Sequence, residues 1–229
     1  MNTIIITGAG GGLGTAVTQT FLNEGYNVIA TVSNDSAKDN IPSHPQLDVR
    51  AVNLTDEDET TAFVESVIKK YHKIDAALLL VGSFAMGDIA ATSGNDLKKM
   101  YALNFETAYF AARPLFKHMK EFGNGRIVFV GTRPALKAAD GKSMVAYALS
   151  KSLLFNLAEY MNEETQGTNV VTTVVVPSTI DTPVNRSAIP GADPSRWVKP
   201  QQIADIMKFI CGNTADVLRE TVLKVYNNA

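Results

Sequence analysis

The stretch T-G-A-G-G-G-L-G, residues 7–14, follows an apolar run directly and leads into a helical pattern over Gly12–Asn23. A glycine-rich turn between a strand and a helix exposes backbone N–H groups to an anion, and the helix dipole favours negative charge there. Gly8 suits the tight turn, whereas Gly12 and Gly14 remove side chains where a pyrophosphate and the sheet approach. The segment therefore predicts a dinucleotide-binding site. Its Gly-x-x-x-Gly-x-Gly spacing differs from the tighter Gly-x-Gly-x-x-Gly pattern, and a plain tight turn is the alternative.

Outward from this turn, short β-rich runs alternate with helical patterns along the rest of the chain. The runs are continuously apolar rather than alternating, which is typical of strands buried on both faces of a parallel sheet. The predicted strands are Thr3–Thr7, Asn27–Val32, Asp48–Val52, Asp75–Val81, Arg126–Val130, Asn169–Val176 and Thr221–Tyr226. The predicted helices are Gly12–Asn23, Asp56–Tyr71, Gly94–Lys120, Met144–Glu164 and Pro200–Cys211. This order predicts right-handed βαβ units, and hence one doubly wound α/β domain over residues 1–229.

Composition and charge place the chain among ordinary globular proteins. Hydrophobic residues make up 45% of its 229 positions and charged residues 19%, with a net charge of −2. This balance predicts neither a nucleic-acid partner nor a membrane-binding patch, and no apolar run approaches the ~20 residues of a membrane span. The single cysteine, Cys211, permits no intrachain disulfide and indicates a reducing compartment. With no signal peptide at the N-terminus we expect a cytoplasmic protein. The three histidines lack ligand spacing, so we expect no metal site.

A second motif, Y-A-L-S-K at residues 147–151, sets a phenol and an amine one helical turn apart. Residues at this spacing lie on one face of a helix. An unperturbed tyrosine titrates near pH 10, and a neighbouring ammonium group stabilises its phenolate. One interpretation of the pair is a phenol, Tyr147, whose pKa Lys151 lowers. The alternative is an amphipathic helix with a buried tyrosine and a lysine that reaches solvent.

With the glycine loop and the Tyr147–Lys151 pair both present, the chain resembles the short-chain dehydrogenase/reductase family over essentially its whole length. That resemblance implies a single Rossmann domain with a seven-stranded parallel sheet. It also implies an NAD(P)-dependent oxidoreductase acting on a small carbonyl or alcohol substrate. Family members form homodimers or homotetramers, often through the helix that carries the Tyr-Lys pair. The resemblance implies that Tyr147 is the general acid/base, and that Lys151 binds the nicotinamide ribose and lowers the pKa of the phenol. It also implies that Asn104 supports a water-linked proton relay; the alternative for Asn104 is a mid-helix residue facing solvent.

The resemblance also implies a set of cofactor contacts. Asn53 and Leu54 would lie against the adenine ring, and the segment after the sixth strand would contact the nicotinamide amide and the pyrophosphate. The full predicted set is Gly8, Gly10, Gly12, Leu13, Gly14, Ser33, Asn53, Leu54, Gly82, Tyr147, Lys151, Pro177, Thr179, Ile180 and Thr182.

The last residue of the second strand bears on the choice of cofactor. NAD-specific members carry an Asp where this chain has Val32, and that Asp accepts a hydrogen bond from the ribose hydroxyl. Asp35 is close in sequence, while Gly11 occupies a place where many NADP-using members have a basic residue. We therefore expect NADP(H) or NAD(H), with NADP(H) slightly favoured.

The chain departs from the family pattern in two places. The family's Asn-Ala-Gly is Leu80-Val81-Gly82 here, and its Ser-Ser is Gly131-Thr132. Thr132 stands fifteen residues before Tyr147, two more than usual, with the extra length in Lys137–Lys142. A threonine hydroxyl has the donor and acceptor capacity of serine, so we assign Thr132 to the catalytic set. Its alternative is a hydrogen bond to local backbone.

Ser143, four residues before Tyr147, is the competing hydroxyl, and we expect it to act as the N-cap of the helix instead. Dihydropteridine reductases resemble this region and lack the serine. A dihydropteridine-reductase-like enzyme and a non-catalytic NAD(P)-binding regulatory protein therefore stay open as alternatives. The irregular stretch 182–199, which contains the sole tryptophan, is predicted to be a substrate loop, with a simple surface excursion as the alternative.

Overall fold

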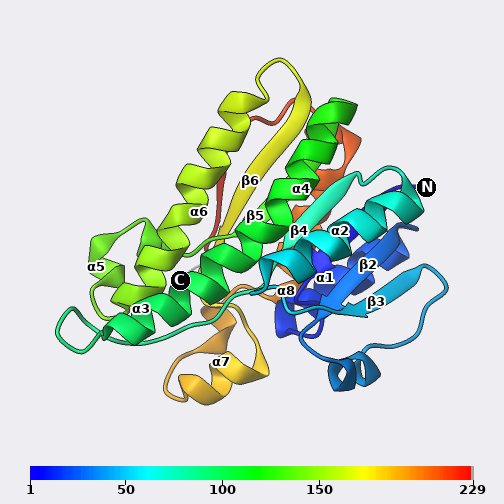
Figure 1. Ribbon diagram of the computed structural model, residues 1–229. Helices are drawn as coiled ribbons and strands as arrows, with labels where there is room; N and C mark the ends of the chain where they lie inside the picture. The colour runs from blue at the N-terminus through cyan, green and yellow to red at the C-terminus, as the bar shows by residue number, and fades with distance from the viewer. Residues whose placement is uncertain (228–229) are drawn as a thin grey trace.

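The computed structural model describes residues 1–227 and has one parallel sheet at its centre (Figure 1). Its seven strands lie in the order β3-β2-β1-β4-β5-β6-β7. The strands are β1 (Thr3–Thr7), β2 (Asn27–Val32), β3 (Leu47–Ala51), β4 (Ala76–Leu79), β5 (Asn124–Val130), β6 (Asn169–Pro177) and β7 (Val222–Val225). The chain moves outward from β1 to β3 and then returns to β4 on the other side of β1. Ligands of open α/β sheets bind at such a reversal, beyond the carboxyl ends of the strands.

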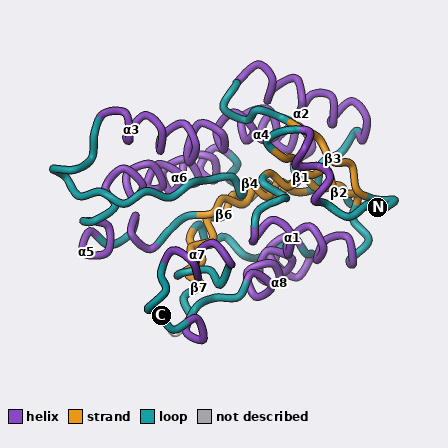
Figure 2. Tube along the Cα trace, turned by 90° about the horizontal axis from the view of Figure 1, so that it is seen from below, coloured by secondary structure: helices purple, strands orange, loops and turns teal. Residues whose placement is uncertain are grey.

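Helices cover both faces of the sheet, so that the fold has three layers (Figure 2). One face carries α1 (Gly12–Asn23) and α8 (Pro200–Cys211). The other face carries α2 (Glu57–Tyr71), α4 (Thr107–Phe122) and α6 (Val145–Glu164). This arrangement is the predicted doubly wound α/β fold.

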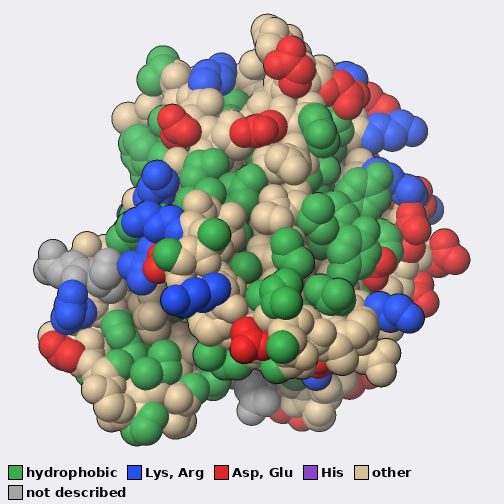
Figure 3. Space-filling view, turned by 90° about the vertical axis from the view of Figure 1, so that its left-hand side faces the viewer, with side chains coloured by type: hydrophobic (Ala, Val, Ile, Leu, Met, Phe, Trp, Pro, Cys, Tyr) green, Lys and Arg blue, Asp and Glu red, His purple; other side chains and the backbone are tan. Residues whose placement is uncertain are grey.

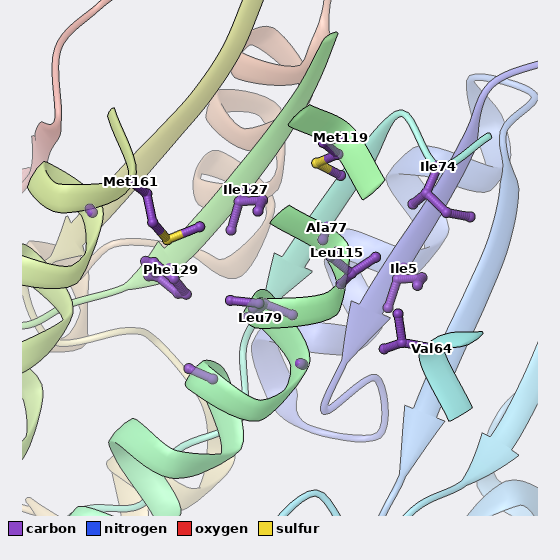
Figure 4. Close-up of a cluster of buried hydrophobic side chains, with 14 of the residues drawn as sticks. Ile5, Val64, Ile74, Ala77, Leu79, Leu115, Met119, Ile127, Phe129 and Met161 are labelled. Atoms are coloured by element: carbon purple, nitrogen blue, oxygen red, sulfur yellow. The ribbon is translucent and has the colours of Figure 1, made fainter. Parts of the chain in front are cut away.

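Each face has its own hydrophobic core. Figure 4 shows the core beneath α2, α4 and α6, where side chains of the central strands meet those of the helices. Ile5, Ile127 and Phe129 are 0% exposed, as are Val64 and Leu115 on the helices. Burying one such side chain contributes about 1.5–3 kcal/mol, so the continuous apolar runs hold the sheet between its layers. The edge strands β3 and β7 are only partly buried.

The predicted helix Gly94–Lys120 is interrupted in the structure. It consists of α3 (Gly94–Tyr101), a π-helical turn (Ala102–Glu106) and α4. The backbone at the junctions stays in the right-handed helical region, so the direction of the helix changes little and the apolar pattern continues across it. A π-turn is frequent at functional sites, and this one holds Asn104.

The segment predicted as an irregular substrate loop is partly helical. It contains α7 (Pro183–Ala188) and a 3-10 turn (Pro194–Arg196). Two backbone hydrogen bonds close its neck, from Asp181 N to Val198 O at 2.8 Å and from Val198 N to Thr179 O at 3.0 Å. Figure 1 shows α7 projecting beyond the carboxyl ends of the strands. The remaining short elements are α5 (Ala138–Gly141) and 3-10 turns at Asp35–Asn40, Arg133–Ala135 and Asn213–Ala215.

Candidate active site

The glycine loop folds tightly at the end of β1. Gly8 has φ +70°, a conformation that residues with a Cβ rarely adopt. A Cβ at Gly14 would collide with the Gly8 carbonyl oxygen, so only glycine allows α1 to begin this close to the strand. Thr182 packs against Gly12, because a Cβ there would lie 2.8 Å from the Thr182 methyl carbon. The loop therefore meets the segment after β6, as a site shared between them requires.

A cavity of about 350 Å³ opens beside this loop. Ser33 and Ala37 line it from the region after β2, and Leu103 and Thr107 from the helical layer. Five of the predicted cofactor residues line the same cavity: Gly8, Gly10, Ser33, Asn53 and Leu54. Its volume falls within the range of small-ligand pockets, and its position at the β1–β4 reversal suits the adenosine part of a dinucleotide.

Asn53 lines this cavity, and local hydrogen bonds already occupy its side-chain oxygen. The Asn53 oxygen already accepts hydrogen bonds from Thr55 N at 3.2 Å and from Thr55 Oγ1 at 2.7 Å. The group available to a ligand is therefore a donor, whereas an Asp at this position would offer only acceptors.

The chain after β2 carries no carboxylate aimed at the cavity. Val32 is 5% exposed, and the next residue, Ser33, lines the cavity. The Asp35 carboxylate forms an ion pair with Lys38 at 2.7 Å, and its side chain is 87% exposed. Asn34 caps the following 3-10 turn by accepting a hydrogen bond from Ala37 N at 3.0 Å.

Tyr147 and Thr132 are brought together at the carboxyl edge of the sheet. Thr132 follows β5, Tyr147 lies in the first turn of α6, and their side chains share a hydrogen bond. Burial raises the pKa of Tyr147, and the hydrogen bond with Thr132 lowers it by a smaller amount. The phenol is therefore protonated at neutral pH. Thr132 is 7% exposed, so its hydroxyl is shielded from bulk solvent.

Ser143 does not cap α6, which corrects the expectation from sequence. Met144 occupies the N-cap position, and no side chain makes a capping hydrogen bond there. The backbone carbonyl of Ser143 instead accepts a hydrogen bond from Gly87 N at 2.8 Å. The segment after β4 therefore determines where this helix starts, and the sequence around Ser143 carries no sign of that long-range contact.

Lys151 lies one turn further along α6 and is buried. Its ammonium group donates a hydrogen bond to the Val130 carbonyl oxygen at 2.8 Å. Burial lowers the pKa of Lys151 to about 8, which still leaves the side chain mostly charged at neutral pH. An ammonium has three protons, so further donors stay available for a ligand.

Asn104 is 0% exposed, so the solvent-facing alternative for this residue is wrong. Its carbonyl oxygen accepts a hydrogen bond from Ser83 N at 2.7 Å, and its amide donates to Ser150 Oγ at 3.0 Å. Ser150 Oγ in turn donates to the Tyr147 carbonyl oxygen at 2.8 Å. Ser150 thus joins the π-turn to the Tyr-Lys helix. The sequence motif Y-A-L-S-K contains this serine, but the spacing of the phenol and amine alone did not single it out.

Gly82 lies between Asn104 and Lys151. A Cβ at Gly82 would lie 2.8 Å from Asn104 Oδ1 and 2.9 Å from Lys151 Nζ. This proximity explains why a glycine stands here although the two preceding residues differ from the family pattern. Thr7, the first residue of the glycine loop, holds the two residues before Gly82 in place. Its hydroxyl accepts hydrogen bonds from Leu80 N at 3.0 Å and Val81 N at 3.4 Å.

The segment after β6 supplies the remaining predicted cofactor residues. Pro177 ends the strand, and Ile180 packs with Leu13 against the core under α1 and α8. Thr179 forms part of the neck of the substrate loop, and Thr182 caps α7 by accepting a hydrogen bond from Asn185 N at 3.2 Å. Thr182 brings this segment against Gly12 of the glycine loop.

Comparison with known proteins identifies the family. The family model for short chain dehydrogenase matches residues 2–192, and the chain belongs to that family. A similar curated protein is a 3-oxoacyl-(acyl-carrier-protein) reductase from Thermotoga maritima, 25% identical over 96% of this chain and 94% of its own length. Another is a 2-(R)-hydroxypropyl-CoM dehydrogenase from Xanthobacter autotrophicus, also 25% identical, over 96% and 94%.

Solved structures agree on the fold. The structure of ElxO with NADP bound has a TM-score of 0.90 at 21% identity, covering 98% of this chain and 96% of that one. Ligand-free aldohexose dehydrogenase from Thermoplasma acidophilum has a TM-score of 0.85 at 24% identity, covering 99% and 93%. As a member of the family the protein is an NAD(P)-dependent oxidoreductase acting on CH–OH or C=O groups. Its glycine loop and adjoining cavity fit a dinucleotide.

Proposed function

We propose that the protein reduces a small carbonyl compound, or oxidises the matching alcohol, with Tyr147 as general acid/base. The observation that carries this proposal is the hydrogen bond between Tyr147 and Thr132, one helical turn from the buried Lys151 ammonium. A substrate oxygen placed between the two hydroxyls would be held by both of them.

Each of these side chains has a defined task at the reacting oxygen or around it. Tyr147 Oη donates its proton to the alkoxide oxygen as that oxygen gains charge, and Thr132 donates a second hydrogen bond to the same atom. The Lys151 ammonium stabilises the phenolate left behind, since a nearby cation favours the charged form of a phenol. Asn104 is a positioning residue, whose amide fixes Ser83 and Ser150 around the site.

The cofactor would be held along the carboxyl edge of the sheet. The adenosine part would occupy the cavity of Ser33, Asn53 and Leu54, and the backbone of the glycine loop would face the pyrophosphate. When bound, the nicotinamide supplies or accepts the hydride. Lys151 would bind the adjoining ribose, and Thr179 the amide. Because no carboxylate faces the cavity after β2, we propose that NADP(H) is accepted, with a slight preference over NAD(H).

Replacing Tyr147 with Phe tests the assignment. A positioned acid contributes ~10²–10⁴-fold to a rate, so Tyr147→Phe should lower kcat by that factor. NADPH affinity, measured by calorimetry, should stay within twofold, because the phenol hydroxyl is assigned to the substrate. Near wild-type kcat in this variant would contradict the mechanism. The same assay separates the alternatives: a pterin-specific enzyme turns over only dihydropteridines, and a regulatory protein binds cofactor without turnover.

We also propose that the protein assembles as a homodimer or homotetramer through α4 and α6. Tyr101, Phe105 and Tyr109 form a row of rings on α3, the π-turn and α4, with centroid separations of 5.3 and 5.9 Å. On α6, Leu149 and Tyr160 are 54% and 72% exposed. Hydrophobic side chains gather on the side of the molecule that Figure 3 presents. A second copy would cover them, and sedimentation equilibrium measures the resulting mass.

Among residues 1–227 no helix is long and apolar enough to cross a membrane. We propose a cytoplasmic location, because a single cysteine is typical of a reducing compartment. Burial raises the pKa of Cys211 to about 12, so this thiol is unreactive at neutral pH.

A further inference from the structure

The segment between β4 and α3 brings an exposed aromatic ring to the phenol of Tyr147. The ring centroids of Phe84 and Tyr147 are 5.1 Å apart, and the ring planes meet at 75°. This edge-to-face geometry is a favourable arrangement for two aromatic rings. Phe84 is nevertheless 56% exposed, so much of its surface is open beside the reacting hydroxyl.

Phe84 and Met86 lie on the same face of the segment that follows β4. Exposure alternates along residues 82–86, as it does in an extended chain, with Phe84 at 56% and Met86 at 65%. Side chains two residues apart in an extended chain share a face. The two residues therefore form a small apolar wall, here named the Phe84 wall.

Hydrogen bonds fix this wall to the start of α6. Gly87 N donates to Ser143 O at 2.8 Å, and Val145 N donates to Gly87 O at 2.8 Å. At the other end of the wall, Ser83 N donates to Asn104 Oδ1. Figure 1 shows the segment leaving β4 and running past the lower ends of α6 and α5 before it enters α3. These hydrogen bonds hold the wall beside the first turn of α6, where Tyr147 lies.

We propose that Phe84 determines substrate specificity, and that the substrates are carbonyl compounds, or the matching alcohols, with a flat apolar group on the carbonyl carbon. The proposal rests on the function proposed above and names its substrate class. The substrate oxygen must lie within about 2.6–3.2 Å of the Tyr147 hydroxyl, so a group on the carbonyl carbon comes beside the ring packed on that phenol. A flat apolar group would cover the Phe84 ring, which a small substrate would leave in water.

The charges on this segment agree with an apolar substrate. Asp88 is the one charged residue between Gly82 and Ala91. Its carboxylate accepts hydrogen bonds from the backbone of Ala90 and Ala91 at 3.0 and 2.8 Å. It therefore serves the local turn, and the segment offers no cation to an anionic group.

The test compares the binding of acetophenone and 2-butanone to the full chain saturated with NADP⁺, by ligand-observed NMR. Both ketones carry the same reacting group, and only acetophenone carries a flat ring. The wild-type protein should bind acetophenone at least tenfold more tightly than 2-butanone. Phe84→Ala should remove most of that ratio, and Phe84→Leu should keep part of it. Ile89→Ala is the matched control, because Ile89 lies on the same segment, is 81% exposed and should leave the ratio unchanged.

Three outcomes would overturn the proposal. Equal binding of both ketones by the wild-type protein, or binding of neither, would show that the wall selects nothing. Equal loss of both ketones in Phe84→Ala would show that the ring acts only by holding Tyr147. Failure of the proposed function has a different signature. A ratio that depends on Phe84, without NADPH oxidation by either ketone, would support the wall and contradict the assignment of Tyr147 as the acid.

Discussion

At the scale of single residues, the question is whether Thr132 takes the place of the family's serine. The sequence lacks the usual serine and adds two residues before Tyr147. The structure places those residues in and beside the short helix α5, where Ala138 and Ala139 are exposed, so the extra length bulges outward. Thr132 stays at the end of β5 and reaches the phenol, because its distance from Tyr147 is set by the sheet and α6 rather than by the chain between them.

Thr132→Val and Ser143→Ala, assayed side by side, test which hydroxyl takes part in the reaction. Valine keeps the shape of threonine and removes the donor. Losing one hydrogen bond to a developing charge should lower kcat by roughly 10- to 100-fold. Ser143 is exposed and offers its backbone carbonyl to Gly87, so Ser143→Ala should leave kcat unchanged. A lower kcat in Ser143→Ala but not in Thr132→Val, at equal melting temperatures, would assign the catalytic hydroxyl to Ser143. No loss in either variant would favour the dihydropteridine-reductase-like alternative.

Gly82→Ala tests the close approach of three site residues. The lysine ammonium can move away from an added methyl group at little cost, because it ends a flexible side chain. Asn104 Oδ1 cannot, because Ser83 N and Ser150 Oγ hold its carboxamide. We therefore expect Gly82→Ala to lower kcat/KM by about tenfold or more, since small displacements in a site cost that much. Gly94→Ala is the control, because a Cβ at Gly94 meets nothing within 4 Å. Equal kinetics in both variants would count against the assigned role of Asn104.

At the scale of secondary-structure elements, the sequence predicts the central strands well and the junctions poorly. The strands β1, β2 and β6 begin at the predicted residues, because their apolar runs are buried on both faces. The π-turn at Ala102–Glu106 was not predicted, since its backbone stays helical and its apolar pattern is unbroken. The turn after β2 was not predicted either. It matters for function, because it decides whether Asp35 can reach a cofactor.

Binding constants for NADPH and NADH test that turn. Asp35 pairs with Lys38 and is exposed, so Asp35→Asn should leave the ratio of the two dissociation constants unchanged. Ser33 lines the cavity and is exposed, so Ser33→Asp should weaken NADPH binding by roughly tenfold through repulsion of the 2′-phosphate. Isothermal calorimetry measures both. A wild-type protein that binds NADH ten times more tightly than NADPH would contradict the expected preference and point to Asp35.

At the scale of the whole molecule, the sequence predicts those features that residues close together in the chain form. Gly8 and Gly14 lie in one short segment, and Tyr147 and Lys151 on one helix turn, so periodicity and spacing reveal them. Thr7, Phe84 and Ser150 act through contacts made by distant segments. Phe84 reaches Tyr147 only because the chain after β4 pairs with the start of α6. Such contacts depend on the packed layers and leave no periodic signal in the sequence.

Those layers also contain a titratable group whose protonation opposes folding. His118 on α4 is 6% exposed, and its Nε2 accepts a hydrogen bond from the Ile74 backbone N–H at 3.3 Å. A protonated imidazole has no acceptor, so this bond requires the neutral form. Burial lowers the pKa of His118 in the folded protein below its ordinary value near 6.5. The bond joins the end of α4 to Ile74, two residues before β4, so its loss would weaken the contact of a helix with the sheet.

The free energy of unfolding should therefore fall with pH below about 6.5, because the unfolded chain binds a proton there that the folded protein does not. His118's contribution is fully present above that pH, and it is lost as the pH falls towards the folded-state pKa, with a slope of at most about 1.4 kcal/mol per pH unit. His118→Gln keeps an acceptor but cannot titrate, so urea unfolding of this variant should show a shallower decline between pH 6.5 and pH 5. His72→Gln, at an exposed histidine, is the control and should follow the wild-type protein. Parallel curves for wild type and His118→Gln would show that the imidazole is not held neutral by the fold, and that this end of α4 gains nothing from the bond to Ile74.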